Sequence, residues 1–252
     1  MLRNDVVVVT GSCGRIGSAV SRNIIEHGGR VVAVDINGKK IKQLEKDYGS
    51  DSCLCLEIDV GNIENASIVI EEAVSKFGRI DSAIHSAYPR SIQWGAKFEN
   101  LEQTYLNEDL SLQIGGSIIF AQRILDYFCK NQAGNLIFVS SIQGVMAPKF
   151  EHYENTNMTS PIEYTAAKHA LIGITRYLAK YYKGNNIRVN CVSPGGILDG
   201  QPEAFLKKYR MSCNDKGMLD AEDIVGAFIF LLSDLSKYIT GQNIIVDDGW
   251  SL

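Results

Sequence analysis

Short apolar runs rich in β-branched residues alternate with longer segments of helical periodicity along the chain. The apolar runs lie at 6–9, 31–34, 53–58, 80–84, 136–139, 187–192 and 243–246. Between two of them, residues 62–77 place apolar side chains every three or four positions, and Gly78 follows as a terminator. Alternating strands and helices form a parallel sheet, because each connection crosses back over the sheet. We predict an α/β, doubly wound (Rossmann) fold with a parallel seven-stranded sheet and helices on both faces.

The domain organisation follows from the absence of any dividing segment. No internal repeat, low-complexity tract or Pro/Gly-rich linker interrupts the 252 residues. Doubly wound folds often reach this length as one domain, so we predict a single domain over 1–252. Residues 142–160 and 197–220 are too long to be simple connections, and we expect them to form loops that shape a substrate pocket.

A glycine-rich turn, Thr10 to Gly17, joins the first strand to a helix. Its glycines permit a tight turn and let backbone N–H groups approach a pyrophosphate, although an ordinary strand-to-helix turn can show the same pattern. The second strand ends in Asp35, 18 residues after Gly17. A carboxylate there accepts both ribose hydroxyls and repels a 2′-phosphate, which favours NAD(H) over NADP(H). Arg15 would suit a 2′-phosphate, a pyrophosphate or a surface ion pair.

Other strand ends carry candidate binding residues, because ligands of such sheets bind beyond the carboxyl ends of the strands. Asp59 and Val60 follow the third strand, where a carboxylate would meet the adenine amino group. Small residues follow His85 at the end of the fourth strand and would leave room for the nicotinamide ribose. His85 itself is more typical of a packed, hydrogen-bonded histidine than of a catalytic one. Ser193 to Gly196 forms a rigid turn suited to the nicotinamide face.

The candidate chemistry lies at Tyr164 and Lys168, four residues apart and so on one face of a helix. Ser160, Pro161 and Glu163 predict the start of that helix, with a capping box between Ser160 and Glu163. An ammonium beside a phenol stabilises the phenolate, so we expect Lys168 to lower the pKa of Tyr164 and make it a usable acid/base.

Ser141 follows the fifth strand, and the chain closes with the segments 239–242 and 246–249. Together with the residues above, these features resemble the short-chain dehydrogenase/reductase family across essentially the whole chain. The resemblance implies that Ser141 orients a substrate carbonyl, Tyr164 transfers the proton, and Lys168 binds the nicotinamide ribose and acidifies Tyr164. It implies no metal. The cofactor-binding residues it implies are Gly11, Ser12, Gly14, Arg15, Ile16, Asp35, Asp59, Val60, Ser86, Ala87, Tyr164, Lys168, Pro194, Gly195, Gly196 and Ile197.

Three positions depart from the family pattern. Arg15 replaces a common glycine of the turn, His85 to Tyr88 replaces an Asn-Asn-Ala-Gly-like segment, and Gln113 stands where the family offers an asparagine for a proton relay. Ser141 and Tyr164 are 23 residues apart, longer than the family's usual spacing. We therefore expect an inserted loop that carries Glu151, His152 and Tyr153 over the site.

The segments Ala87 to Arg90, Asn157 to Thr159 and Asp247 to Gly249 look like the subgroup of dehydrogenases of flagellin modification and sugar (carbohydrate) biosynthesis. This resemblance implies a nucleotide sugar, a sugar phosphate or a related polar substrate. Four cations in 201–217 suggest a positive loop over the pocket and an anionic substrate, although a solvated helix face fits them equally well. They are Lys207, Lys208, Arg210 and Lys216.

Composition narrows the partners and the location. A net charge of −4 without a long basic run indicates neither a nucleic-acid groove nor a polybasic membrane patch. No apolar run reaches the ~18 residues of a membrane span, and the N-terminus lacks the features of a signal peptide, so we expect a cytoplasmic protein. Six scattered cysteines show no zinc-site spacing. The helix after Tyr164 carries more apolar and aromatic surface than one sheet face can cover, at Ala170, Ile174, Tyr177, Leu178 and Tyr181. The family resemblance implies that this helix pairs with its copy in a homodimer or homotetramer.

Two other functions stay open on the sequence. An NAD-binding regulator would keep the cofactor turn without turnover, against which the Ser141, Tyr164 and Lys168 set argues. A sugar epimerase or dehydratase shares the Tyr/Lys pair, but those longer relatives carry an additional C-terminal substrate domain that these 252 residues do not contain. We favour an NAD(P)-dependent oxidoreductase that transfers a hydride between nicotinamide and a carbonyl or alcohol.

Overall fold

A seven-stranded parallel sheet forms the centre of the computed structural model, which describes residues 1–252. Its strand order is β3-β2-β1-β4-β5-β6-β7, and the chain reverses direction across the sheet between β1 and β4. This confirms the predicted fold class. The strands are β1 (Val6–Thr10), β2 (Arg30–Asp35), β3 (Cys53–Glu57), β4 (Ser82–His85), β5 (Gly134–Val139), β6 (Ile187–Pro194) and β7 (Asn243–Val246).

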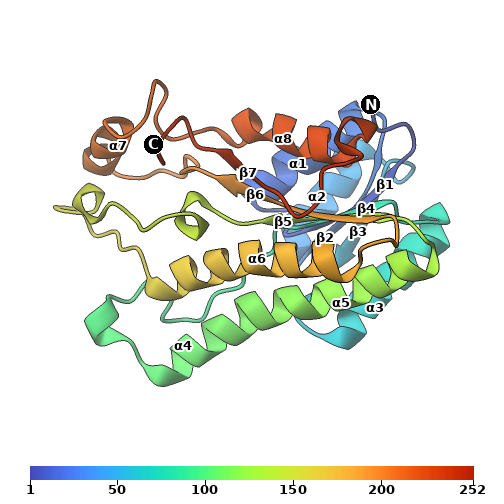
Figure 1. Cartoon of the computed structure of the whole chain (residues 1–252), viewed down its shortest axis with the longest axis horizontal. Helices are drawn as coiled ribbons and strands as arrows, with labels where there is room; N and C mark the ends of the chain where they lie inside the picture. Colours follow the sequence, from blue (N-terminus) through green and yellow to red (C-terminus); the bar gives the residue numbers. More distant parts are fainter.

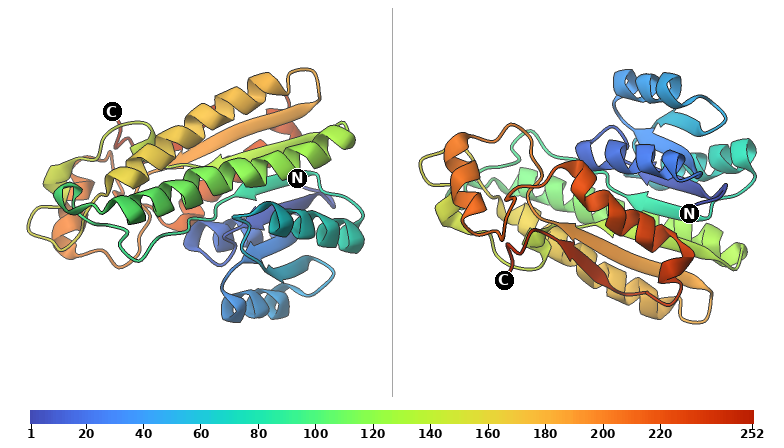
Figure 2. Two further views of the ribbon diagram at one scale, coloured as in Figure 1. Left: turned by 90° about the horizontal axis from the view of Figure 1, so that it is seen from below. Right: turned by 90° about the horizontal axis from the view of Figure 1, so that it is seen from above.

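Helices cover both faces of the sheet (Figures 1 and 2). One face packs against α1, α2 and α8, and the other against α3, α5 and α6. A π-helical turn, Ser111–Gly115, joins α4 to α5. The helices are α1 (Arg15–Glu26), α2 (Gly38–Tyr48), α3 (Ile63–Phe77), α4 (Gln103–Leu110), α5 (Gly116–Lys130), α6 (Ile162–Tyr181), α7 (Glu203–Arg210) and α8 (Val225–Leu232).

The core explains why β1 is apolar at four of its five positions. All five residues of β1 are buried, because successive side chains point to opposite faces and both faces are covered. Val8 packs with Phe120 in the core on the α5 side, and Val9 packs with Phe228 in the core on the α8 side. Burying a side chain of this size stabilises the fold by roughly 1.5–3 kcal/mol.

The predicted helix end at Gly78 is confirmed. Asn62 caps α3, and Gly78 ends it in the left-handed region, at φ 81°. The predicted capping box before α6 is wrong, because the helix begins at Ile162 with Pro161 as its N-cap and no side-chain cap. The Ser160 hydroxyl instead donates a hydrogen bond to Gln143 Oε1 (2.8 Å).

Several connections gather beyond the carboxyl ends of the strands, on the left of Figure 1. The loop 142–160, the segment around α7 and the C-terminal residues pack into a separate apolar cluster. Its buried members are Ile142, Phe205, Tyr209, Met218 and Trp250. None of the helices combines the length and apolar character needed to span a membrane.

Candidate active site

Two adjoining cavities lie at this edge of the sheet, across the point where the strand order reverses. One has a volume of about 490 Å³ and is lined by β5, α6 and the two long loops; the other, of about 430 Å³, is lined by the ends of β2, β3 and β4. Gly11, Gly14, Ser86, Tyr88 and Arg90 line both. A ligand extended along this edge therefore contacts both halves.

The glycine-rich turn brings backbone close to both cavities. Gly11 has φ 67°, and a Cβ there would lie 2.8 Å from the Ser86 carbonyl oxygen. A Cβ on Gly17 would overlap the Gly11 carbonyl group. Helix α1 follows at once, with Gly14 as its N-cap and no side-chain cap. Its first N–H groups are oriented to bind an anionic group, so the turn fits the pyrophosphate of a dinucleotide.

The smaller cavity has the groups that an adenosine requires. Asp35 accepts hydrogen bonds from the backbone N–H groups of Cys13 and Asn37 (2.9 Å each), which fixes its carboxylate on the cavity wall. Asp59 and Val60 line the same cavity. Ile36, an exposed side chain next to Asp35, also lines it; sequence reasoning missed this residue, although its position directly after the strand was a signal.

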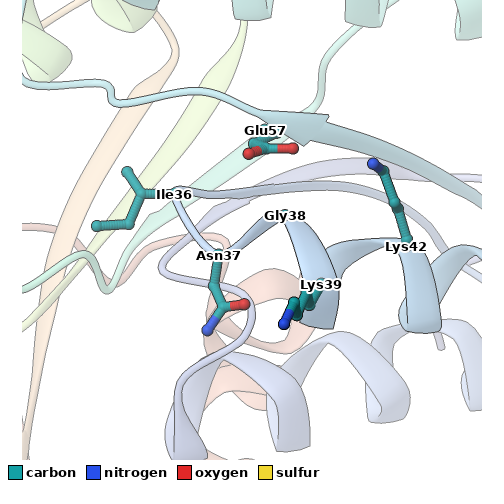
Figure 3. A pocket seen from close by; sticks show the side chains of 6 residues that line it. All are labelled: Ile36, Asn37, Gly38, Lys39, Lys42 and Glu57. Atoms are coloured by element: carbon teal, nitrogen blue, oxygen red, sulfur yellow. The ribbon is translucent and has the colours of Figure 1, made fainter.

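A shallow basic hollow adjoins the smaller cavity. Ile36 and Asn37 line both the hollow (Figure 3) and that cavity. Lys39 and Lys42 project from α2, while the carboxylate of Glu57 lies over Gly38 (Figure 3). The hollow thus holds two cations and one carboxylate beside the Asp35 position.

Arg15, in the glycine-rich turn, forms an ion pair with Asp199, in the segment after β6. Both residues line the larger cavity. Both side chains are more than half exposed, so the pair adds little to stability. Its consequence is electrostatic, because the carboxylate offsets the charge of Arg15. Of the three roles that the sequence left open for Arg15, the structure shows the ion pair.

Tyr164 and Lys168 lie on α6 against the larger cavity, as does Ser141 at the end of β5. Lys168 Nζ donates to the Val139 carbonyl (2.9 Å) and lies 5.6 Å from the centre of the Tyr164 ring. The Ser140 hydroxyl donates to the Lys168 carbonyl (2.7 Å), which ties α6 to β5. The three predicted catalytic side chains therefore share one cavity wall.

Burial shifts the pKa values of this pair. It raises the pKa of Tyr164, with the Ser141 hydroxyl acting in the opposite direction. It lowers the pKa of Lys168 to about 8, because no carboxylate offsets the buried ammonium. The sequence predicted a lowered pKa for Tyr164; in the structure, loss of solvent outweighs the opposing effect of the Ser141 hydroxyl and raises this pKa, so Tyr164 stays a protonated donor at neutral pH.

Gln143 connects the catalytic helix to the inserted loop. Its Oε1 accepts hydrogen bonds from Ser160 (2.8 Å) and Thr165 (3.1 Å), and its Nε2 donates to the Tyr153 hydroxyl (3.3 Å). Its own N–H donates to Ser141 Oγ (3.1 Å). Sequence reasoning missed Gln143; its spacing of two residues from Ser141 was the available signal.

Two polar residues near the site have structural roles. His85 Nδ1 lies 3.0 Å from Thr10 Oγ1, and burial lowers the pKa of His85 to about 3, so it is a neutral, packed residue as predicted. Gln113, in the π-helical turn, donates to the Pro89 carbonyl (3.2 Å). Gln113 thus holds the segment after β4 in place.

The segment after β6 forms the remaining wall. Pro194, Gly195, Gly196 and Ile197 line the larger cavity as predicted, and the Gly196 N–H donates to the Tyr209 hydroxyl (2.6 Å). A Cβ on Gly195 would lie 2.9 Å from Asp247 Cα, so this turn needs glycine to approach β7 closely.

Some predicted residues lie away from the cavities. Ser12 is fully buried and its N–H donates to the Val34 carbonyl, so of the predicted cofactor residues it alone lines neither cavity. His152 and Tyr153 line the larger cavity, but Glu151 does not.

The segment 201–217 lines the larger cavity, but its four cations fit the second alternative, a solvated surface. Lys208 binds Glu154 and backbone carbonyls, Lys216 binds Asp220 and Asp223, and Lys207 and Arg210 lie on the outer surface of α7. None of the four lines either cavity, because Phe205 and Tyr209 occupy the inner face of that helix.

Comparisons with known proteins find relatives that match essentially the whole chain. Residues 13–251 match the family model described as enoyl-(acyl carrier protein) reductase. The post-translational flagellin modification protein A of Campylobacter coli is 43% identical, over the whole of both chains. A 3-oxoacyl-[acyl-carrier-protein] reductase of Thermotoga maritima is 29% identical, covering 98% of each chain.

A solved short-chain dehydrogenase from Leptospira borgpetersenii, with bound NAD⁺, superposes with a TM-score of 0.89 at 27% identity, covering 100% of this chain and 94% of that one. The fold, the paired cavities and these matches agree with the resemblance seen in the sequence. The chain belongs to the short-chain dehydrogenase/reductase family of nicotinamide-dependent oxidoreductases.

Proposed function

We propose that this enzyme is an NAD(H)-dependent dehydrogenase that interconverts a carbonyl and an alcohol on a sugar derivative, with Ser141, Tyr164 and Lys168 as its catalytic residues. The observation that carries the proposal is the position of these three side chains on one cavity wall, in a cavity that continues to the glycine-rich turn. The flagellin modification relative supports a sugar-related substrate.

The geometry supports a simple division of roles. The bound nicotinamide supplies or accepts the hydride. Tyr164 donates its phenolic proton to the carbonyl oxygen during reduction, and takes it back during oxidation. Ser141 holds that oxygen beside Tyr164, and the Lys168 ammonium stabilises the phenolate left after proton transfer. Gly11, Gly14 and the start of α1 hold the pyrophosphate, while Asp35, Asp59 and Val60 hold the adenosine.

We propose NAD(H) as the preferred cofactor because Asp35 would face a 2′-phosphate. The native enzyme is expected to bind NADH at least about tenfold more tightly than NADPH. Replacing Asp35 by alanine is expected to reduce this ratio of Kd values, since it removes a repulsion between like charges. Calorimetric Kd values for both cofactors measure the effect. Asp35→Asn is the matched control for the two backbone hydrogen bonds, since it keeps an acceptor without the charge. Equal or tighter binding of NADPH to the native enzyme would contradict the assignment.

A turnover assay separates this function from an epimerase or a regulator. A dehydrogenase consumes NADH in proportion to alcohol formed, an epimerase regenerates its cofactor, and a regulator shows no turnover. A screen of carbonyl sugars that follows NADH absorbance tests this directly. Product formation without net NADH consumption would favour the epimerase.

We also propose a homodimer or homotetramer that covers the outer surface of α6. Tyr177 and Tyr181 are 66% and 68% exposed and stack with ring centres 5.9 Å apart, whereas Ile174 and Leu178 pack against the core. Sedimentation at micromolar concentration is expected to show a dimer or larger species. Substituting both tyrosines by lysine is expected to shift it toward the monomer. Ile68→Lys, on α3, is the control; a native monomer would refute the proposal.

A further inference from the structure

The segment after β4 carries a stack of side chains that begins at the catalytic tyrosine. The ring of Tyr88 meets that of Tyr164 edge to face, with centres 5.3 Å apart, and meets that of Trp94 in the same way at 5.9 Å. The guanidinium carbon of Arg90 lies 5.0 Å from the centre of the Trp94 ring and 6.0 Å from that of Tyr88. Arg90 is thus held by aromatic faces near the reacting centre.

Hydrogen bonds to side chains of α4 and the π-helical turn hold the residues on either side of Arg90. Pro89 accepts a hydrogen bond from Gln113, as described above. Ser91 donates through its N–H and its hydroxyl to the buried carboxylate of Asp109 (2.7 and 2.8 Å). These bonds limit where the Arg90 side chain can reach, so its position against the cavity is built into the fold.

Arg90 also lacks an anionic partner. The charged residues that line the larger cavity are Arg15, Arg90, Lys168 and Asp199. Asp199 pairs with Arg15, and Lys168 donates to the Val139 carbonyl. No ion pair or hydrogen bond involves the Arg90 side chain, which is exposed at the cavity. Its planar fork of N–H donors matches a carboxylate or a phosphate, and its weak hydration favours such pairing.

We propose that Arg90, supported by Trp94 and Tyr88, is the subsite for an acidic group of the substrate, a carboxylate or a phosphate held apart from the reacting carbonyl. This inference rests on the proposed function, because it defines the substrate class of the same cavity. In this proposal a preference for an anionic substrate comes from Arg90 and not from the cations around α7.

The test uses the full-length enzyme saturated with NADH and three sugar probes, glucose 6-phosphate, glucuronate and glucose, titrated by calorimetry. At least one acidic sugar is expected to bind about tenfold or more tightly than glucose, the effect of a charge-assisted hydrogen bond. The tighter of the two identifies phosphate or carboxylate as the group. Arg90→Gln is expected to abolish the difference, and Arg90→Lys to retain part of it.

Lys207→Gln is the matched control, since it removes one exposed cation that lines neither cavity. It is expected to leave the preference for the acidic sugar intact. Equal binding of acidic and neutral sugars, including no binding of any, overturns the proposal. A loss of NADH affinity in Arg90→Gln also overturns it, because Arg90 would then serve the cofactor.

Failure of the proposed function is a separate result. It would appear in the native enzyme as no NADH consumption with any carbonyl compound, whereas failure of the subsite leaves turnover of neutral carbonyl compounds intact.

Discussion

Replacing Tyr164 by phenylalanine is expected to lower kcat for carbonyl reduction by about 10²-fold or more, the contribution of a positioned general acid. The substitution removes only the hydroxyl from a partly buried ring, so the aromatic contact with Tyr88 is retained. NADH affinity is expected to stay close to that of the native enzyme, because the pyrophosphate and adenosine contacts come from other elements. Stopped-flow measurement of NADH oxidation and a calorimetric titration provide the two readouts.

Tyr153→Phe is the matched control for this experiment. Tyr153 is a second partly buried tyrosine that lines the same cavity, and its hydroxyl accepts a hydrogen bond from Gln143. It is expected to alter KM more than kcat, because it bounds the substrate cavity without lying on the catalytic helix. Normal turnover by Tyr164→Phe, or an equal loss of kcat in both variants, would show that Tyr164 is not the proton donor.

Replacing Lys168 by methionine is expected to lower kcat by about 10²-fold, the effect of removing one group that stabilises charge in the transition state. Methionine has a similar length and no charge, so the buried space stays filled. The native enzyme should keep a constant kcat/KM for reduction at neutral pH and lose activity as pH rises past about 8, where Lys168 loses its proton. Tyr164 remains protonated in that range because burial raises its pKa.

Lys168→Arg tests the origin of this pH dependence. Arginine stays charged far above pH 8, so the residual activity of this variant is expected to lack the decline. If the decline persists with the same midpoint, Lys168 is not the titrating group. If a higher NADH concentration restores the activity that Lys168→Met loses, Lys168 instead serves cofactor binding alone.

The same pKa shift predicts a change in stability with pH. The folded pKa of Lys168, about 8, is below its ordinary value of 10.5. Between these values the unfolded chain binds more protons than the folded one, so stability contributed by this group rises with pH across that window. Lys168→Met should therefore be more stable than the native enzyme at pH 7, and the difference in Tm should shrink as pH approaches 10.5.

The sequence by itself determined the fold and most of the site, because the signals that define them are local. Strands buried on both faces are apolar at most positions, and the crossover helices have an apolar residue every three or four positions, so both patterns can be read without coordinates. Parallel strands bring their carboxyl ends to one edge, which places Asp35, Asp59 and Ser141 together. A spacing of four residues puts Tyr164 and Lys168 on one helix face.

Only the tertiary structure decided which polar groups meet across the site. Arg15 and Asp199 are 184 residues apart, and the partners of Gln143 include Tyr153 in the middle of the loop 142–160 and Ser160 at its end. Ser160 was free to cap α6, but the nearby Gln143 amide offered it another partner. The outward position of Lys207 follows from the packing of Phe205 and Tyr209 on the inner face of α7. Such choices depend on how separate segments pack, which spacing along the chain does not encode.

Burial decided the electrostatics for the same reason. The sequence places a cation four residues from a phenol, and in water that spacing would lower the pKa of the phenol. In the folded protein both groups lose their solvent, so the pKa of Tyr164 rises and that of Lys168 falls. The proposed catalytic residues could therefore be named from the sequence, whereas their protonation at neutral pH is set by the three-dimensional enclosure that β5, α6 and Tyr88 build around them.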